Sequence, residues 1–341
     1  MKKYSSFCYF VLSMTFMINF TNNNNNNAYA KEYKSTSGNY SMNIPENTIL
    51  ISEGSTSYRF AQGNINIECN ILSLPAELQT NKENNNSSDR IIKLDNLLLS
   101  SIADTNYQNT NSSWQKHKNK ELLYQTFENK SADNPNKEKL LADTIFINNK
   151  NVFVISAFAP NSENDKAVEL LASILNTVRI NDTKDLKNNY FTNIAAGYAL
   201  NLPSGWQNKI GNTYNIIQLQ KADNQVIGSI RTFTTNEYAQ YARASEPELS
   251  RLENQLLERM TKYSSNQTII THKPININGL NGILIEKTIN KQDEIIDQLE
   301  CYIFTANKGF QISFSSKDKK QYDIFQTDFL NSISSFKTLG Y

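Results

Sequence analysis

Large apolar residues at every second position from Tyr198 to Leu202 predict a strand, which Pro203 ends because it cannot donate a ladder hydrogen bond. Ser245 and Glu248 then have the spacing of a helix capping box. The apolar residues that follow recur at steps of three and four and predict one buried helix face: Leu249, Leu252, Leu256, Met260 and Tyr263.

Strands follow this helix. The sequence predicts them over 268–277, 282–289 and 299–305, with a turn at Asn307-Lys308-Gly309 before a further strand over 310–314. A final helix is predicted from apolar residues that recur at steps of three and four: Tyr322, Phe325, Phe329, Ile333 and Phe336.

The first half repeats this order more loosely. Its opening strand alternates Tyr40, Met42 and Ile44, and a strand pair is clearest over 65–71, as it is over 226–233 in the second half. Polar insertions at 81–88 and 131–139 are expected to be loops. The two helical stripes consist of Ile91, Leu94, Leu98 and Ile102, and of Val168, Leu171, Leu175 and Val178.

Landmarks recur in the same order at nearly one spacing, which indicates an internal duplication. Pro45 and Pro203 are 158 positions apart, as are the turn-flanking residues Phe146 and Phe304. The two histidines, His117 and His272, are 155 positions apart, and each is followed by Lys. We therefore predict two homologous domains, 31–185 and 197–341, joined by a linker over 186–196.

Each half is predicted to be α+β, with a mainly antiparallel sheet of about six strands and two main helices. Strands that are apolar on both sides, such as Tyr302-Ile303-Phe304, indicate a sheet that helices cover on both faces.

The run Gly197-Tyr198-Ala199-Leu200-Asn201-Leu202-Pro203-Ser204-Gly205-Trp206 resembles the opening of PsbP-like and DcrB-like domains. The first half departs from it, since Pro45-Glu46-Asn47-Thr48 lacks the Trp. The resemblance implies an α/β/α sandwich that serves as a noncatalytic, often extracytoplasmic, partner-binding domain. Trp206 is then expected either as a core anchor or as a ligand contact.

Residues 1–30 have the order of a secretory signal peptide. Lys2 and Lys3 precede an apolar run over 7–20, and the small residues Ala28 and Ala30 mark a cleavage site before Lys31. A retained anchor is the alternative, but this run is shorter than the ~20 residues that a spanning helix needs. The protein is therefore expected to be exported, as a periplasmic, cell-surface or secreted protein with no integral membrane span after cleavage.

The basic and acidic residues of the chain nearly balance, so its net charge does not favour one class of partner. The chain of 341 residues carries 34 basic and 33 acidic residues, and its polar surplus is largely uncharged, as in the run Asn22 to Asn27. No nucleic-acid partner is expected from this balance. After removal of the signal, two cysteines remain, Cys69 and Cys301, which could form a disulfide in an oxidising compartment or be two separate core thiols.

Candidate chemistry is sparse. His117 and His272 are the sole imidazoles for a Ser/His/Asp or Cys/His site, and no G-x-S-x-G elbow accompanies them. No metal motif or phosphate-binding glycine loop occurs, so we predict no cofactor, no metal site and no catalytic residues.

These features lead to three hypotheses. The first is an exported, noncatalytic two-domain module that recognises a protein or envelope component. The second is an extracytoplasmic carrier of a small ligand, with Tyr198, Trp206 and Tyr214 lining its pocket. The third is a hydrolase of unknown type.

Overall fold

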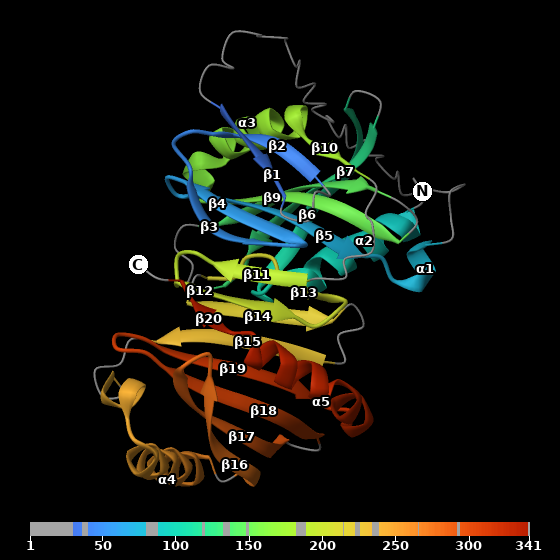
Figure 1. Ribbon diagram of the computed structural model, residues 1–341. Coiled ribbons are helices and arrows are strands. Elements are labelled where there is room, and N and C mark those ends of the chain that lie inside the picture. The colour runs from blue at the N-terminus through green and yellow to red at the C-terminus, as the bar shows by residue number, and fades with distance from the viewer. Residues whose placement is uncertain are drawn as a thin grey trace, which may run out of the picture.

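The same order of strands and helices occurs twice along the chain (Figure 1). The computed structural model describes residues 30–35, 40–79, 88–117, 120–131, 137–147, 150–181, 189–213, 215–221, 226–233, 239–264, 266–291 and 294–339. In Figure 1 the first half, coloured blue to green, lies above the second half, coloured yellow to red. Strands β11, β12 and β13 lie between them.

Ten strands, three α-helices and one 3-10 turn lie in the described residues of the first half. They are β1 (Ala30–Lys34), β2 (Tyr40–Pro45), β3 (Ile49–Gly54), β4 (Ser57–Gln62), β5 (Ile65–Ser73), α1 (Ala76–Gln79), α2 (Ser88–Ser101), β6 (Tyr107–His117), β7 (Lys120–Asn129), β8 (Lys139–Phe146), β9 (Asn151–Ala159), η2 (Asn161–Glu163), α3 (Asn164–Thr177) and β10 (Arg179–Ile180).

The second half follows the same plan. Its elements are β11 (Asn189–Asn193), β12 (Tyr198–Leu202), β13 (Trp206–Asn208), β14 (Ile216–Lys221), β15 (Val226–Phe233), η3 (Ala239–Arg243), α4 (Glu246–Tyr263), β16 (Gln267–Ile277), β17 (Leu280–Lys291), β18 (Glu294–Phe304), β19 (Gly309–Ser316), α5 (Lys319–Ser334) and β20 (Lys337–Thr338).

Strand order corresponds between the halves, strand for strand. The second half has the order β13-β14-β15-β19-β18-β17-β16, and the first half contains β3-β4-β5-β9-β8-β7-β6. The smaller arrangement β1-β2-β10 likewise matches β11-β12-β20. All of these pairings are antiparallel. The fold is α+β with mainly antiparallel sheets. In the described residues, the corresponding part of the main sheet has seven strands in each half, where about six were expected.

Helices cover both faces of each main sheet. In the first half, α3 packs over one core and α2 over another, because their apolar stripes face opposite sides of the sheet. In the second half, α5 covers the larger core and α4 the smaller one. The predicted capping box begins α4: the Ser245 N–H donates to Glu248 Oε2 at 2.8 Å. None of the described helices is long and apolar enough to cross a membrane.

A buried carboxyl on β8 corresponds to an apolar core residue on β18. Asp143 on β8 is 6% exposed and lies between Leu141 and Ile145 on the α3 side of the sheet. Burial raises its pKa to about 7. The position 158 residues later holds Cys301, an apolar core residue.

Candidate functional site

The two halves are joined through β11, which lies in the segment expected as a linker. This strand pairs with β12 in its own half and with β3 of the first half, where Phe191 lies opposite Gly54. A Cβ on Gly54 would lie 2.8 Å from the Tyr190 carbonyl oxygen, so the close approach of the two backbones requires glycine. One ten-stranded sheet therefore runs through both halves.

A second contact inserts Ile210 into the first half. This residue is fully buried in the core beneath α2, together with Ile102. Its N–H donates to the Ser101 carbonyl at 2.7 Å, and its carbonyl accepts from Ala103 N–H at 2.7 Å. Ile210 therefore completes a core that the first half forms around it.

Gly211 permits this insertion. Its φ of +77° lies in the left-handed region that side chains other than glycine disfavour. A Cβ at this position would lie 2.9 Å from the ring of Phe158 on β9. Both the backbone conformation and the available space therefore select glycine here.

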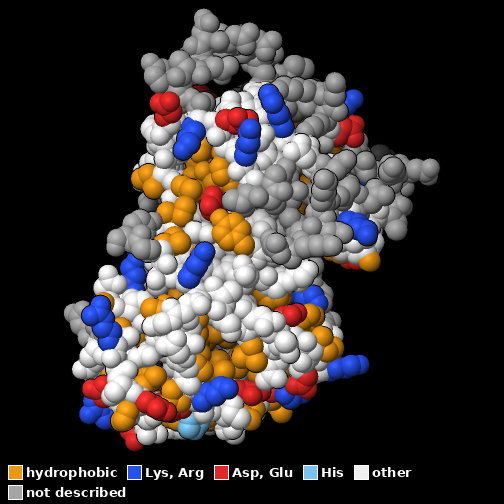
Figure 2. Space-filling view, viewed as in Figure 1, with side chains coloured by type: hydrophobic (Ala, Val, Ile, Leu, Met, Phe, Trp, Pro, Cys, Tyr) orange, Lys and Arg blue, Asp and Glu red, His pale blue; other side chains and the backbone are white. Residues whose placement is uncertain are grey.

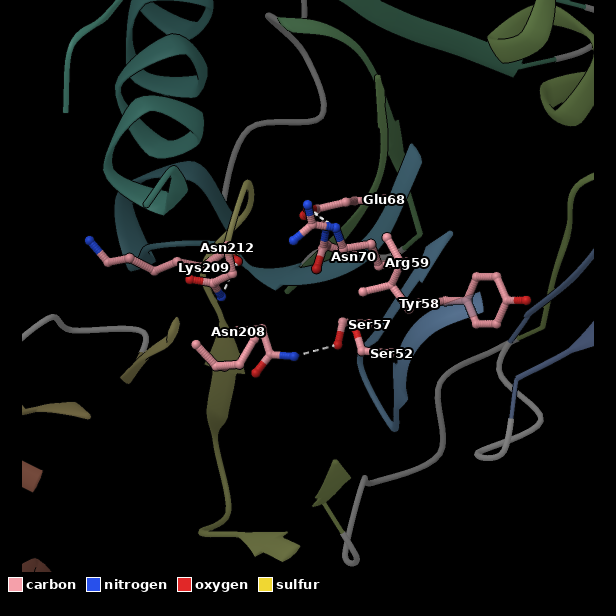
Figure 3. Close-up of a pocket in the computed structure, with 11 residues that line it drawn as sticks. Ser52, Ser57, Tyr58, Arg59, Glu68, Asn70, Asn208, Lys209 and Asn212 are labelled. Atoms are coloured by element: carbon pink, nitrogen blue, oxygen red, sulfur yellow. Dashed lines mark hydrogen bonds and ion pairs between the residues drawn. The ribbon is translucent and has the colours of Figure 1, made fainter. Parts of the chain in front are cut away.

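Beside this segment lies a polar pocket that both halves form (Figure 3). Its centre is an ion pair between residues opposite each other on β4 and β5: Arg59 Nε lies 3.3 Å from Glu68 Oε1. The two side chains are 15% and 6% exposed. Glu68 Oε2 also accepts the Gly211 N–H at 3.0 Å, so the carboxylate binds the second half directly.

Burial raises the pKa of Glu68, and the Arg59 charge, the Gly211 N–H and the Asn70 side chain partly oppose this shift. Burial also lowers the pKa of Lys209, whose amine points away from Arg59 and Glu68 in Figure 3. The pocket thus holds one buried ion pair, and Lys209 also lines it.

Across the pocket, Asn208 Nδ2 donates to Ser57 Oγ at 2.7 Å. Asn208 Oδ1 and Arg59 Nη1 are buried and have no hydrogen-bond partner among the described residues. The cavity between the halves measures about 20 Å³. That volume and this mixture of donors and acceptors suit one bridging water molecule, because a water needs at least ~10–15 Å³ and two or more polar partners. A metabolite of ordinary size would not fit.

Tyr198 and Trp206, which were predicted to line a ligand pocket, do not line one. Tyr198 is fully buried between Phe310 and Phe336, and Trp206 packs edge-on against Phe314. Their interpretation as ligand or partner contacts is therefore wrong, because both side chains fill the core between the sheet and α5. Tyr214 lies outside the described residues.

Cys69 and Cys301 are two separate thiols. Cys69 and Cys301 are free and fully buried, Cys69 in the core under α3 and Cys301 in the core under α5. Of the two alternatives left open by the sequence, the structure therefore has the separate core thiols and not the disulfide. Burial raises both thiol pKa values, which keeps the thiols protonated and unreactive.

The remaining predicted positions that the structure describes lie apart from the junction. Ala28 is outside the described residues, and Ala30 is the first residue of β1. His117 ends β6, while His272 on β16 lies 2.8 Å from the Glu253 carboxylate of α4. No group of three or more His, Cys, Asp or Glu side chains within the described ranges is placed to hold a metal ion.

Sequence reasoning missed the residues of the junction. Glu68 carried a weak signal, because it is the one charged residue on the polar side of an alternating strand, between Asn66 and Asn70. Asn208 and Gly211 had none, since their roles depend on residues of the first half that are far away in sequence.

Comparisons with known proteins give distant structural similarities. No family model matches the chain, and no curated protein matches it. The chain is similar to the cyanobacterial PsbP of Synechocystis sp. PCC 6803 at 12% identity and a TM-score of 0.35, over 47% of this chain and 97% of that one.

Two proteins of Pseudomonas aeruginosa are also similar. Protein PA94, described as of unknown function, has 11% identity and a TM-score of 0.30, over 42% of this chain and 92% of its own. The type VI secretion system (T6SS) immunity protein TplEi has 10% identity and a TM-score of 0.27, over 91% of this chain and 97% of its own.

Proposed function

We propose that this protein is an exported, noncatalytic module of two homologous domains that binds a protein or envelope component. A duplication is supported by the repeated sequence landmarks and by the matching strand orders. Export rests on the signal-like first 30 residues, with cleavage between Ala30 and Lys31.

The observation that carries the binding role is the junction. Strand β11 extends the sheet of the first half, and Ile210 fills its core, so the two domains are held in one fixed orientation. Domains that only share a flexible linker reorient freely, whereas domains in a fixed orientation present a combined surface without an ordering cost at binding. Figure 2 shows charges of both signs mixed over the visible face, which fits recognition by shape and local contacts.

The junction gives less support to a small-ligand carrier. Its cavity of about 20 Å³ is far below the ~300–1,000 Å³ of ordinary ligand pockets. Tyr198 and Trp206, two of the aromatic residues predicted to line such a pocket, are buried in the core instead.

The test is crosslinking of intact cells that make the affinity-tagged full chain, followed by identification of the captured species. An unrelated exported protein with the same tag is the control. We expect one or a few species that are enriched with this chain and absent from the control. Repeated recovery of nothing above the control would overturn the binding role. Sequencing of the purified chain's N-terminus checks export separately, with Lys31 as the expected first residue.

A further inference from the structure

The two main sheets can be compared position by position on the faces that α2 and α4 partly cover. At the matching turns, Phe146 pairs with Val152, and Phe304 pairs with Gly309. Four residues further along each strand, Ser156 of β9 therefore corresponds to Ser313 of β19. Ser156 lies opposite Glu68, and Ser313 lies opposite Ser229. Glu68 of the first half and Ser229 of the second half therefore occupy corresponding places.

The neighbouring strands extend this correspondence. Arg59 lies opposite Glu68, as Gln218 lies opposite Ser229. Two residues along each strand, on the same face of the sheet, the pair Ser57 and Asn70 of the first half corresponds to the pair Ile216 and Arg231 of the second half.

In the first half these places are covered by a segment from the other domain. Asn208 binds Ser57, Gly211 binds Glu68, and Ile210 enters the core beside α2. As a result Ser57 is 7% exposed and Asn70 is 3% exposed.

In the second half the corresponding places are open. Ile216 is 40% exposed, Ile227 on the same face is 51% exposed, and Arg231 is exposed. Arg231 has no ion-pair partner among the residues that the structure describes. We call the surface of Ile216, Gln218, Ile227, Ser229 and Arg231 the open face.

We propose that the open face docks an extended segment of a partner protein that carries an apolar side chain and a carboxylate. This inference rests on the proposed partner binding and names its site. The mode of binding follows from the first half, where the chain from Asn208, the last residue of β13, to Gly211 covers the same places. The exposed isoleucines supply apolar area, and the Arg231 guanidinium can accept a carboxylate in a bidentate geometry.

A second copy of the chain fits this face less well. Two open faces that meet about a twofold axis present the same surface to each other, so the Arg231 side chains would contribute like charges to one interface. A carboxylate from a different protein complements the guanidinium without this penalty.

The test places a photoreactive amino acid at position 227 of the full chain, and in a separate variant at position 324. Ile324 is the matched control, because it is 56% exposed and lies on α5, across the sheet from the open face. After irradiation of intact cells, mass spectrometry identifies the linked protein and the linked peptide. We expect one partner linked from position 227, at least tenfold more than from position 324, through a peptide that contains Asp or Glu.

A synthetic copy of that peptide is then titrated against the purified chain. Arg231→Glu is expected to weaken binding at least tenfold, whereas the charge-matched Lys320→Glu on α5 leaves it unchanged. Linkage to a second copy, linkage from position 324 alone, or an Arg231→Glu variant that binds normally would overturn the docking site while partner binding stands. No linked partner from either position, together with an empty whole-cell capture, would overturn the proposed function as well.

Discussion

Asp143 is a buried carboxyl with no charged partner among the residues that the structure describes, and its removal is expected to stabilise the protein at neutral pH. Burial raises its pKa from the ordinary value of 3.8 to about 7. The variant Asp143→Asn keeps the size of the side chain and cannot ionise. The gain should depend on pH, because only the ionised form is disfavoured in the core.

The sign follows from linkage. Below pH 3.8 the carboxyl is protonated in both the folded and the unfolded state, so its ionisation contributes nothing. Between pH 3.8 and about 7 the unfolded state ionises and the folded state does not, so the free energy of unfolding falls as pH rises. The full penalty is reached above pH 7 and amounts to ~4 kcal/mol, because each tenfold change in proton affinity is worth ~1.4 kcal/mol.

The assay is urea denaturation of wild type and Asp143→Asn from pH 4.5 to 8.5, with tryptophan fluorescence as the readout. Trp114 reports on the first half, because its ring stacks on Phe146 of β8 at 6.0 Å. Asp328→Asn on the exposed surface of α5 is the control and should track wild type. The stability gain of Asp143→Asn should grow by several kcal/mol across this range. A gain that is constant with pH would refute the reasoning.

Three further predictions concern the junction, each measured as a change in the free energy of unfolding. Arg59→Met should cost ~3–5 kcal/mol, because it leaves Glu68 buried and unpaired. Adding Glu68→Gln to this variant should recover part of the loss. A double variant that is no more stable than Arg59→Met alone would contradict the ion-pair role. Gly211→Ala should cost at least ~1 kcal/mol more than Gly205→Ala, because both have a left-handed φ but only the first meets a neighbouring ring; equal losses would refute the contact. Ile210→Ala should cost ~2–5 kcal/mol, and a loss under ~1 kcal/mol would show that the side chain does not fill the core.

Local signals in the sequence predicted the helices well. The capping box at Ser245 begins α4 as expected, and the stripe from Tyr322 to Ile333 lies on α5. Apolar periodicity and capping both act within a few residues, so they can be read without knowing the rest of the fold. The opening strands and the strands that follow α4 in the second half were predicted for the same reason.

The junction could not be predicted, because it depends on contacts between distant residues. Residues 186–196 were expected as a linker from their polar composition, yet β11 lies within them and pairs with β3. Polarity did not exclude a strand here, since a strand that joins two sheets needs backbone hydrogen bonds more than apolar side chains. Ile210 gave no signal either, because its partners belong to α2 of the other half.

Aromatic residues misled the sequence analysis at Tyr198 and Trp206. Large aromatic side chains serve equally well in a core or in a ligand pocket, and composition does not distinguish the two. Their burial against α5 became evident only from packing.

The shared sheet also affects the order in which the protein can be made. When α3 has been synthesised, the first half still lacks β11 on the edge of β3 and Ile210 in the core under α2. An unpaired strand edge beside an unfilled core is a template for misassembly with other chains. The proposed duplication divides the chain into two halves, but the unit of maturation is larger than one half: the first half finishes folding only after the second half has begun to emerge.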